Sequence, residues 1–129
     1  MDEKRILKDL EKLIPYSMGI IIYGSHVKGY ADKKSDIDVC IVKKESIDEK
    51  KLFHEILNVS SEDYDIVMFD KIPWYLKGKI IEEGKIIYAE DRDYLDFWLY
   101  KQAKIWNDMK RRQKKVSKED LMKRVKKIK

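Results

Sequence analysis

One apolar run that ends at a small-residue turn constrains the fold of this chain more than any other feature. Residues 18–23 read Met-Gly-Ile-Ile-Ile-Tyr, and Gly24-Ser25 follows them directly. A short, continuous apolar run closed by a glycine turn is typical of a buried β-strand. The sequence therefore predicts a strand over residues 18–23 that stops at the Gly-Ser turn.

A second β-rich run begins with two carboxylates. Asp36 and Asp38 lie two residues apart, and the apolar stretch from Ile37 continues to Val42. Alternation along a strand places both carboxylates on one face, with Ile37 on the other. Two like charges held this close are unfavourable unless a cation or a proton lies between them. The pair therefore predicts a metal site, and the nearby turn indicates a ligand that carries phosphate.

The remaining pattern alternates helices and strands, which predicts an α+β domain with α/β-type layering. We expect a small mixed sheet of about four strands flanked by helices, with a long C-terminal helix. The predicted helices cover residues 2–14 (ending at Pro15), 25–30, 46–58 (opened by a capping box at 46–49), 73–84 and 92–112, and Ser117 is predicted to cap a short basic helix. The predicted strands cover residues 18–23, 37–42, 64–69 and 85–89, and residues 32–35 form a polar loop.

We expect the 129 residues to form one domain over residues 1–112, which includes the long C-terminal helix, followed by a basic tail or short helix over residues 113–129. Cys40 is the single cysteine, which excludes an intramolecular disulfide and suits a reducing cytoplasm. The charged start of the chain does not resemble a secretion signal, and no apolar stretch approaches the roughly 20 residues that cross a bilayer. We therefore expect a cytoplasmic protein.

The positive charge of the chain is concentrated at its C-terminal end. Residues 110–129 carry 11 Lys and Arg side chains against Glu119 and Asp120. Such a tail binds nucleic acid or an acidic partner in some proteins and is simply solvated in most. All three interpretations stay open at the level of sequence.

A third carboxylate would complete a two-metal site of the kind that handles phosphate esters. Asp65 is the best candidate, because it begins a strand that is otherwise apolar; its alternative is a solvated acid at a strand edge. Asp63 and Asp70 are the rivals, but they flank the run and resemble solvated strand ends. Mg²⁺ prefers oxygen ligands and commonly keeps substrate phosphates in its shell, so Mg²⁺ is the expected metal.

The Gly24-Ser25 turn offers a place for phosphate groups. Glycine lets the backbone approach a ligand closely, the following helix would present free N–H groups, and Ser25 adds a hydroxyl. Lys28 lies one turn further on, where it could contact a phosphate or point to solvent. The Gly-Lys-Ser/Thr ending of a Walker A loop is absent.

Taken together, Gly24-Ser25, Gly29 and Ser35-Asp36-Ile37-Asp38 match the pattern GSxxxGxxxxxSDxD. This pattern resembles that of the DNA polymerase β-like nucleotidyltransferases, and the short chain resembles their minimal nucleotidyltransferase (MNT) group. The resemblance extends over residues 1 to about 110, and it implies the nucleotidyltransferase fold. His26 and Lys28 stand where many relatives have arginine or another residue.

The resemblance also implies a reaction. Gly24, Ser25, Lys28 and Ser35 would bind the nucleotide triphosphate, and Asp36, Asp38 and Asp65 would bind Mg²⁺ as the catalytic residues. Transfer of NMP, with ATP as the expected donor, would release pyrophosphate. The MNT group is often paired with a helical HEPN protein, in many cases a toxin, whose tyrosine is the expected acceptor of AMP.

Other functions remain compatible with the sequence. The chain could be a non-catalytic antitoxin that neutralises a HEPN partner by contact, or it could modify an RNA end or a small molecule, with the basic tail guiding RNA. The aromatic helix 92–112 carries more apolar side chains than one sheet face needs, so part of it could await a partner. An oligomer is also compatible with the sequence.

Overall fold

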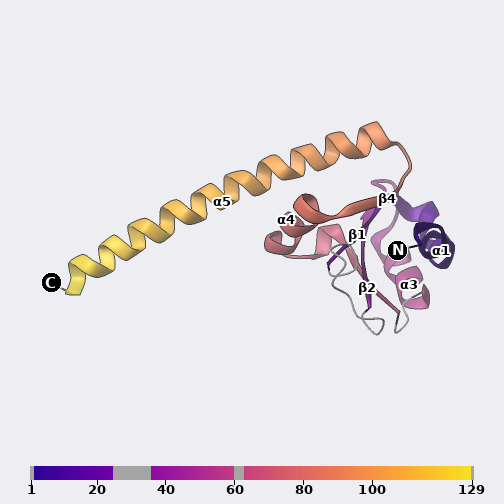
Figure 1. The fold of residues 1–129 in the computed structure, drawn as a ribbon, viewed down its shortest axis with the longest axis horizontal. Helices are drawn as coiled ribbons and strands as arrows, with labels where there is room; N and C mark the ends of the chain where they lie inside the picture. The colour runs from indigo at the N-terminus through magenta and orange to yellow at the C-terminus, as the bar shows by residue number, and fades with distance from the viewer. Residues whose placement is uncertain (1, 25–35, 60–62, 129) are drawn as a thin grey trace.

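The computed structural model describes residues 2–24, 36–59 and 63–128, with side chains described as far as residue 112. Its centre is a four-stranded mixed sheet in the order β3-β2-β1-β4 (Figure 1). The strands are β1 (Ser17–Tyr23), β2 (Ile37–Lys43), β3 (Tyr64–Met68) and β4 (Lys85–Ala89). β1 is antiparallel to both β2 and β4, whereas β2 and β3 are parallel. The predicted fold class and all four strands are confirmed.

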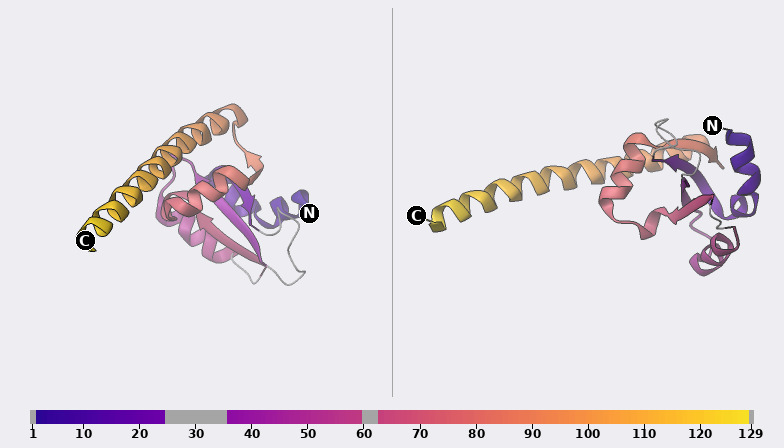
Figure 2. Two further views of the ribbon diagram at one scale, coloured as in Figure 1. Left: turned by 60° about the vertical axis from the view of Figure 1, so that its left-hand side comes forward. Right: turned by 60° about the horizontal axis from the view of Figure 1, so that its bottom comes forward.

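Helices cover both faces of the sheet (Figures 1 and 2). One face packs against α1 (Glu3–Asp9), the 3₁₀ helix η1 (Glu11–Tyr16) and α3 (Glu49–Val59). The other face packs against η2 (Phe69–Lys71), α4 (Trp74–Glu83) and the first turns of α5 (Arg92–Ile128). β1 is therefore covered on both faces, and each of its seven residues is buried.

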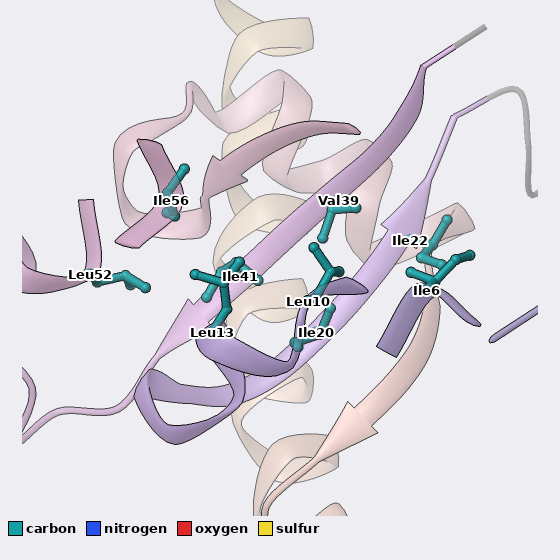
Figure 3. Close-up of a cluster of buried hydrophobic side chains, with 9 residues drawn as sticks. All are labelled: Ile6, Leu10, Leu13, Ile20, Ile22, Val39, Ile41, Leu52 and Ile56. Carbon is teal, nitrogen blue, oxygen red and sulfur yellow. The ribbon is translucent and has the colours of Figure 1, made fainter. Parts of the chain in front are cut away.

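The core on the first face is aliphatic, and side chains from helices and strands meet in it (Figure 3). Its buried members are Ile6, Leu10, Leu13, Ile20, Ile22, Val39, Ile41, Leu52 and Ile56. The core on the second face contains Met18, Ile21, Tyr23, Cys40, Val42, Phe69, Ile80 and Leu95. At about 25 cal/mol for each Å² of apolar surface removed from water, these two clusters are the main source of stability.

The prediction of one helix over residues 2–14 was wrong in detail. The α-helix ends at Asp9, and a 3₁₀ helix that contains Pro15 follows from Glu11. Proline lacks an N–H group, and its ring clashes with the carbonyl four residues earlier in an α-helix. A 3₁₀ segment accommodates the proline and keeps Leu13 buried, and the hydroxyl of Ser17 donates to the carbonyl of Leu13 at 2.7 Å.

Two helix boundaries also differ from the prediction. α3 begins at Glu49, and Asp48 rather than Ser46 caps it, because the Asp48 carboxylate accepts from the backbone N–H of Lys50 at 3.0 Å. α5 continues without a break to Ile128, so Ser117 does not start a separate helix. The division into residues 1–112 and a tail stays a prediction, and the predicted helix 25–30 lies outside the described residues.

α4 holds α5 against the domain through a close helix contact. The indole of Trp106 lies so near Gly78 that a Cβ at position 78 would overlap its ring. The same indole N–H donates to Glu82 at 3.2 Å, and Lys110 donates to that carboxylate at 2.7 Å. These two contacts lower the pKa of Glu82, the Lys110 bond most. Beyond this contact, α5 projects away from the sheet (Figures 1 and 2).

Among the described residues, no helix has both the length and the apolar character that a bilayer crossing requires.

Candidate functional site

Two of the three predicted metal ligands lie side by side on neighbouring strands. In the parallel pairing of β2 with β3, Asp38 is directly in register with Asp65. Neighbouring strands are about 4.8 Å apart, and partners in register point to the same face. Asp38 shares its face with Cys40, which belongs to the cluster under α4 and α5. The sheet therefore brings together two carboxylates that are 27 positions apart in the chain.

The phenol of Tyr23 lies beside this pair. Tyr23 is the last residue of β1. It pairs with Asp38 on the side of β2 opposite to β3, so Asp38 lies between Tyr23 and Asp65 in the sheet. Its ring is buried, and its pKa is raised, first by burial and then by the negative charge of Asp38, with smaller electrostatic contributions from Cys40 and Asp65. Tyr23 was not among the site residues predicted from the sequence. The signal that could have found it is one hydroxyl-bearing ring at the end of an aliphatic strand.

Gly24 permits the close approach of the turn to the acidic pair. Its φ is +82°, in the region that favours glycine, and it is the only positive-φ residue in the described part of the chain. A Cβ at this position would overlap the Oδ2 atom of Asp38. Glycine is therefore favoured at position 24 on two grounds, the backbone conformation and the space beside Asp38, while its role in binding phosphate stays a prediction.

Asp36 immediately precedes β2 and is exposed. It lies at the same end of the sheet as Asp38, but the described residues contain no group of three or more His, Cys, Asp or Glu side chains that could hold a metal ion. Ser25, Lys28 and Ser35 lie outside the described residues. Their roles, and the metal ligands as a set, stay predictions.

The rivals of Asp65 are placed differently. Asp63 precedes β3, where its backbone carbonyl accepts from the N–H of Ile37 at 2.9 Å. Asp70 lies in η2, beyond the opposite end of β3. It is close enough to Cys40 to raise the pKa of that thiol, although burial raises it more. Of the three acids around this strand, Asp65 is the one in register with Asp38.

The residues present fit a hard divalent cation. Asp38 and Asp65 supply carboxylate oxygens from adjacent strands, and the lack of a side chain at Gly24 lets the backbone lie close to the Oδ2 atom of Asp38. At about 5 Å, two carboxylates repel each other by about 1 kcal/mol in water, and more where the site is shielded. A cation between them would turn this repulsion into attraction. A cation held between the two carboxylates would also offset the negative charge of a phosphate ester bound beside them.

Comparison with known proteins gives the relatives of this chain. Residues 5–93 match the family model described as "Polymerase beta, Nucleotidyltransferase". The chain is 38% identical over 94 residues to the "Putative protein adenylyltransferase MJ1547" of Methanocaldococcus jannaschii, covering 73% of each sequence. It is 24% identical over 96 residues to the protein adenylyltransferase MntA of Shewanella oneidensis, covering 72% of this chain and 69% of that one.

Solved structures share the fold. One, described as a toxin-antitoxin with AMP-PNP, has a TM-score of 0.71 at 21% identity and covers 95% of this chain and 99% of that one. Another, a tri-AMPylated HEPN toxin of Shewanella oneidensis in complex with MNT antitoxin, has a TM-score of 0.65 at 19% identity, over 93% and 95% of the two chains. With the fold, the acidic pair and the family match in agreement, the chain belongs to the polymerase β-type nucleotidyltransferase family.

Proposed function

We propose that this chain is a Mg²⁺-dependent nucleotidyltransferase that moves AMP from ATP to a protein hydroxyl, a tyrosine of a HEPN-type partner, and that it acts as that partner's antitoxin. The observation that carries the proposal is the register of Asp38 with Asp65 beside the Tyr23-Gly24 strand end. Two relatives bear the name of protein adenylyltransferases, one of them as a putative assignment, and one structural neighbour is a toxin-antitoxin with an ATP analogue. These names support the choice of AMP and of a protein acceptor.

Each residue has a role in this proposal. Gly24, Ser25, Lys28 and Ser35 bind the triphosphate, and Asp36, Asp38 and Asp65 hold Mg²⁺, which supplies charge neutralisation on the phosphates. The acceptor oxygen attacks the α-phosphorus in line, the bond from that phosphorus to the bridging oxygen breaks, and pyrophosphate leaves. Asp65 accepts the proton of the acceptor hydroxyl. Such a reaction depends mainly on alignment and charge, so a few carboxylates suffice.

Exposed apolar side chains on α5 support the proposal of a partner protein. Tyr94, Phe97, Tyr100 and Ile105 are large apolar residues that are between 44% and 57% exposed. Lys101 lies over the ring of Phe97 at 4.6 Å, and Lys104 lies over the ring of Tyr100 at 4.9 Å. Exposed aromatic rings bordered by lysines suit a partner with apolar side chains and an acidic rim. Surplus apolar surface on this helix was expected from the sequence, and the described part of α5 exposes four such side chains.

The same side chains also favour the alternative, an antitoxin that neutralises its partner by contact without catalysis. Such an antitoxin would need the exposed aromatic side chains of α5 but not the carboxylates of Asp38 and Asp65. Nucleotidyl transfer to RNA or to a small molecule is the other alternative, with the basic end of α5 as the RNA contact.

The test is to incubate the protein with Mg²⁺, α-labelled ATP and a purified HEPN-type toxin. We expect label on a tyrosine of the toxin, and we expect Asp38→Asn and Asp65→Asn each to lower the rate at least 10²-fold. Asp70→Asn is the matched control, because it removes a carboxylate near the same strand but away from the pair. Full neutralisation of the toxin by Asp38→Asn, with no label transferred by the unaltered protein, would refute catalysis and favour the contact antitoxin.

A further inference from the structure

An apolar groove of about 590 Å³ runs between α3 and β3. Phe53 and Ile56 of α3 line it on one side, and Ile66 and Met68 of β3 line it on the other. Lys71 and Glu49 border it and form an ion pair with each other. The groove is thus a channel with an apolar floor and a small charged rim.

The inner wall of the groove is the edge of the sheet. β3 is the outermost strand of the described sheet, and it pairs with β2 along one side only. On its other side, the backbone of β3 is paired with no strand in the part of the chain that the structure describes. Natural sheets usually shorten, charge or cover an edge strand, because an open apolar edge is a template for another strand. Here Ile66, Val67 and Met68 are all half-buried, and the groove follows them.

The same edge strand carries one member of the acidic pair. Asp65 precedes Ile66 in the same strand, and it is in register with Asp38. A strand advances about 3.3 Å per residue, so an extended segment lying against Ile66 to Met68 ends within about 10 Å of Asp65. Ile66 and Met68 face α3, whereas Asp65 shares the opposite face of the sheet with Asp38. A strand added along this edge would therefore place alternate side chains over the groove and on the face of the acidic pair.

We propose that the groove holds an extended, apolar segment of the protein acceptor, which adds as a strand to β3 and brings a hydroxyl-bearing side chain to Asp65. This inference rests on the proposed function and names how its acceptor is recognised. Main-chain hydrogen bonds to the edge would give affinity, and the pocket beside Phe53 would select an apolar side chain a few residues from the modified one. A groove with apolar walls gives RNA few phosphate contacts, so the acceptor that it fits is a polypeptide.

Phe53 provides the test, and α3 itself provides the control. Phe53 is 53% exposed and lines the groove, whereas Leu57, one turn further along α3, is 58% exposed and lies outside the lining. Replacing either with glutamine removes similar apolar surface from a position that is already half in water, so both variants should fold. Only Phe53→Gln alters the groove.

We expect Phe53→Gln to raise the KM for a purified HEPN-type toxin at least tenfold with little change in kcat, and Leu57→Gln to change both less than twofold. The KM for ATP should be unaffected in each variant. A photoreactive benzoylphenylalanine at position 53 should crosslink to the toxin segment that carries the labelled tyrosine, and the same group at position 57 should not.

The outcomes separate this inference from the proposed function. Asp38-dependent transfer with an unchanged KM in Phe53→Gln would overturn the groove as the acceptor site and leave the proposed function standing. Crosslinking at position 53 only to a second copy of this chain, or to a toxin segment distant from the labelled tyrosine, would overturn it too. No transfer by the unaltered protein would overturn both.

Discussion

Gly24→Ala tests whether AMP transfer depends on the glycine conformation and on the space beside Asp38. The φ of +82° costs an alanine about 1–2 kcal/mol relative to glycine. Its Cβ would also overlap the Oδ2 atom of Asp38, so the carboxylate or the turn must shift. Since a misplacement of about 1 Å can cost on the order of 10²-fold in rate, we expect a loss of that size in AMP transfer.

Two measurements check this expectation. Thermal unfolding should show a Tm lowered by roughly 4–8 °C, the shift that about 1–2 kcal/mol produces in a domain of this size. A single-turnover assay with α-labelled ATP should show the fall in rate at saturating ATP. Both readouts are needed, because a loss of stability alone does not explain a loss of rate below the Tm.

Gly19→Ala is the matched control in the same strand. Its Cβ would meet Cδ2 of Leu95 at 2.7 Å, which is the flexible end of a side chain and not a carboxylate. Gly19 pairs with Val42 and Ala89, away from Asp38. We therefore expect Gly19→Ala to lower stability but to keep the transfer rate within threefold. A Gly24→Ala protein with unchanged Tm and rate would refute the reasoning, and equal rate losses in both variants would refute its link to Asp38.

Other consequences can be measured directly. Trp106→Ala removes the ring that packs on α4 and its hydrogen bond to Glu82. Because the ring is only half-buried, we expect urea unfolding to show a free energy of unfolding lower by about 2 kcal/mol. A decrease below about 0.5 kcal/mol would contradict the role of this contact in holding α5. Burial and then the hydrogen bond to Asp9 raise the pKa of Tyr64. The stabilisation that Tyr64 adds to the folded state is therefore fully present below about pH 10, the pKa of a tyrosine in the unfolded chain, and it is lost as the pH rises further. The unfolding free energy of Tyr64→Phe should fall less steeply above pH 10 than that of the unaltered protein, and equal slopes would contradict this assignment.

Sequence reasoning succeeded where local chemistry decides the structure. Runs rich in apolar and β-branched residues marked all four strands, and Gly84 marked the end of α4, because these signals act within a few residues. It failed where the local signal was ambiguous. Residues 92–128 contain neither glycine nor proline, so nothing in them stops a helix, and a serine such as Ser117 is tolerated inside one.

The candidate site depends on strand order, which no local pattern contains. The spacing of Asp36 and Asp38 indicated a metal site from the sequence. The choice of Asp65 over Asp63 and Asp70 rested on its place in an apolar run, and the register with Asp38 now supports that choice. The register follows from the parallel pairing of β2 with β3 across α3, a contact between distant parts of the chain. Tyr23 was overlooked for the same reason, because only the folded sheet brings its ring to the two carboxylates.

The two sides of the acidic pair differ in burial, and this difference suits two different tasks. Asp38 lies on β2, a central strand next to the fully buried β1, where close packing fixes its position relative to Gly24. Asp65 lies on the edge strand, whose residues are half-buried or exposed. In the proposed reaction, the nucleotide triphosphate is the same in every cycle and would benefit from a rigid site, because alignment of the α-phosphorus would set the rate. The proposed protein acceptor would have to enter, align and leave as a modified chain, and an open edge beside an apolar groove would allow that exchange without disturbing the core.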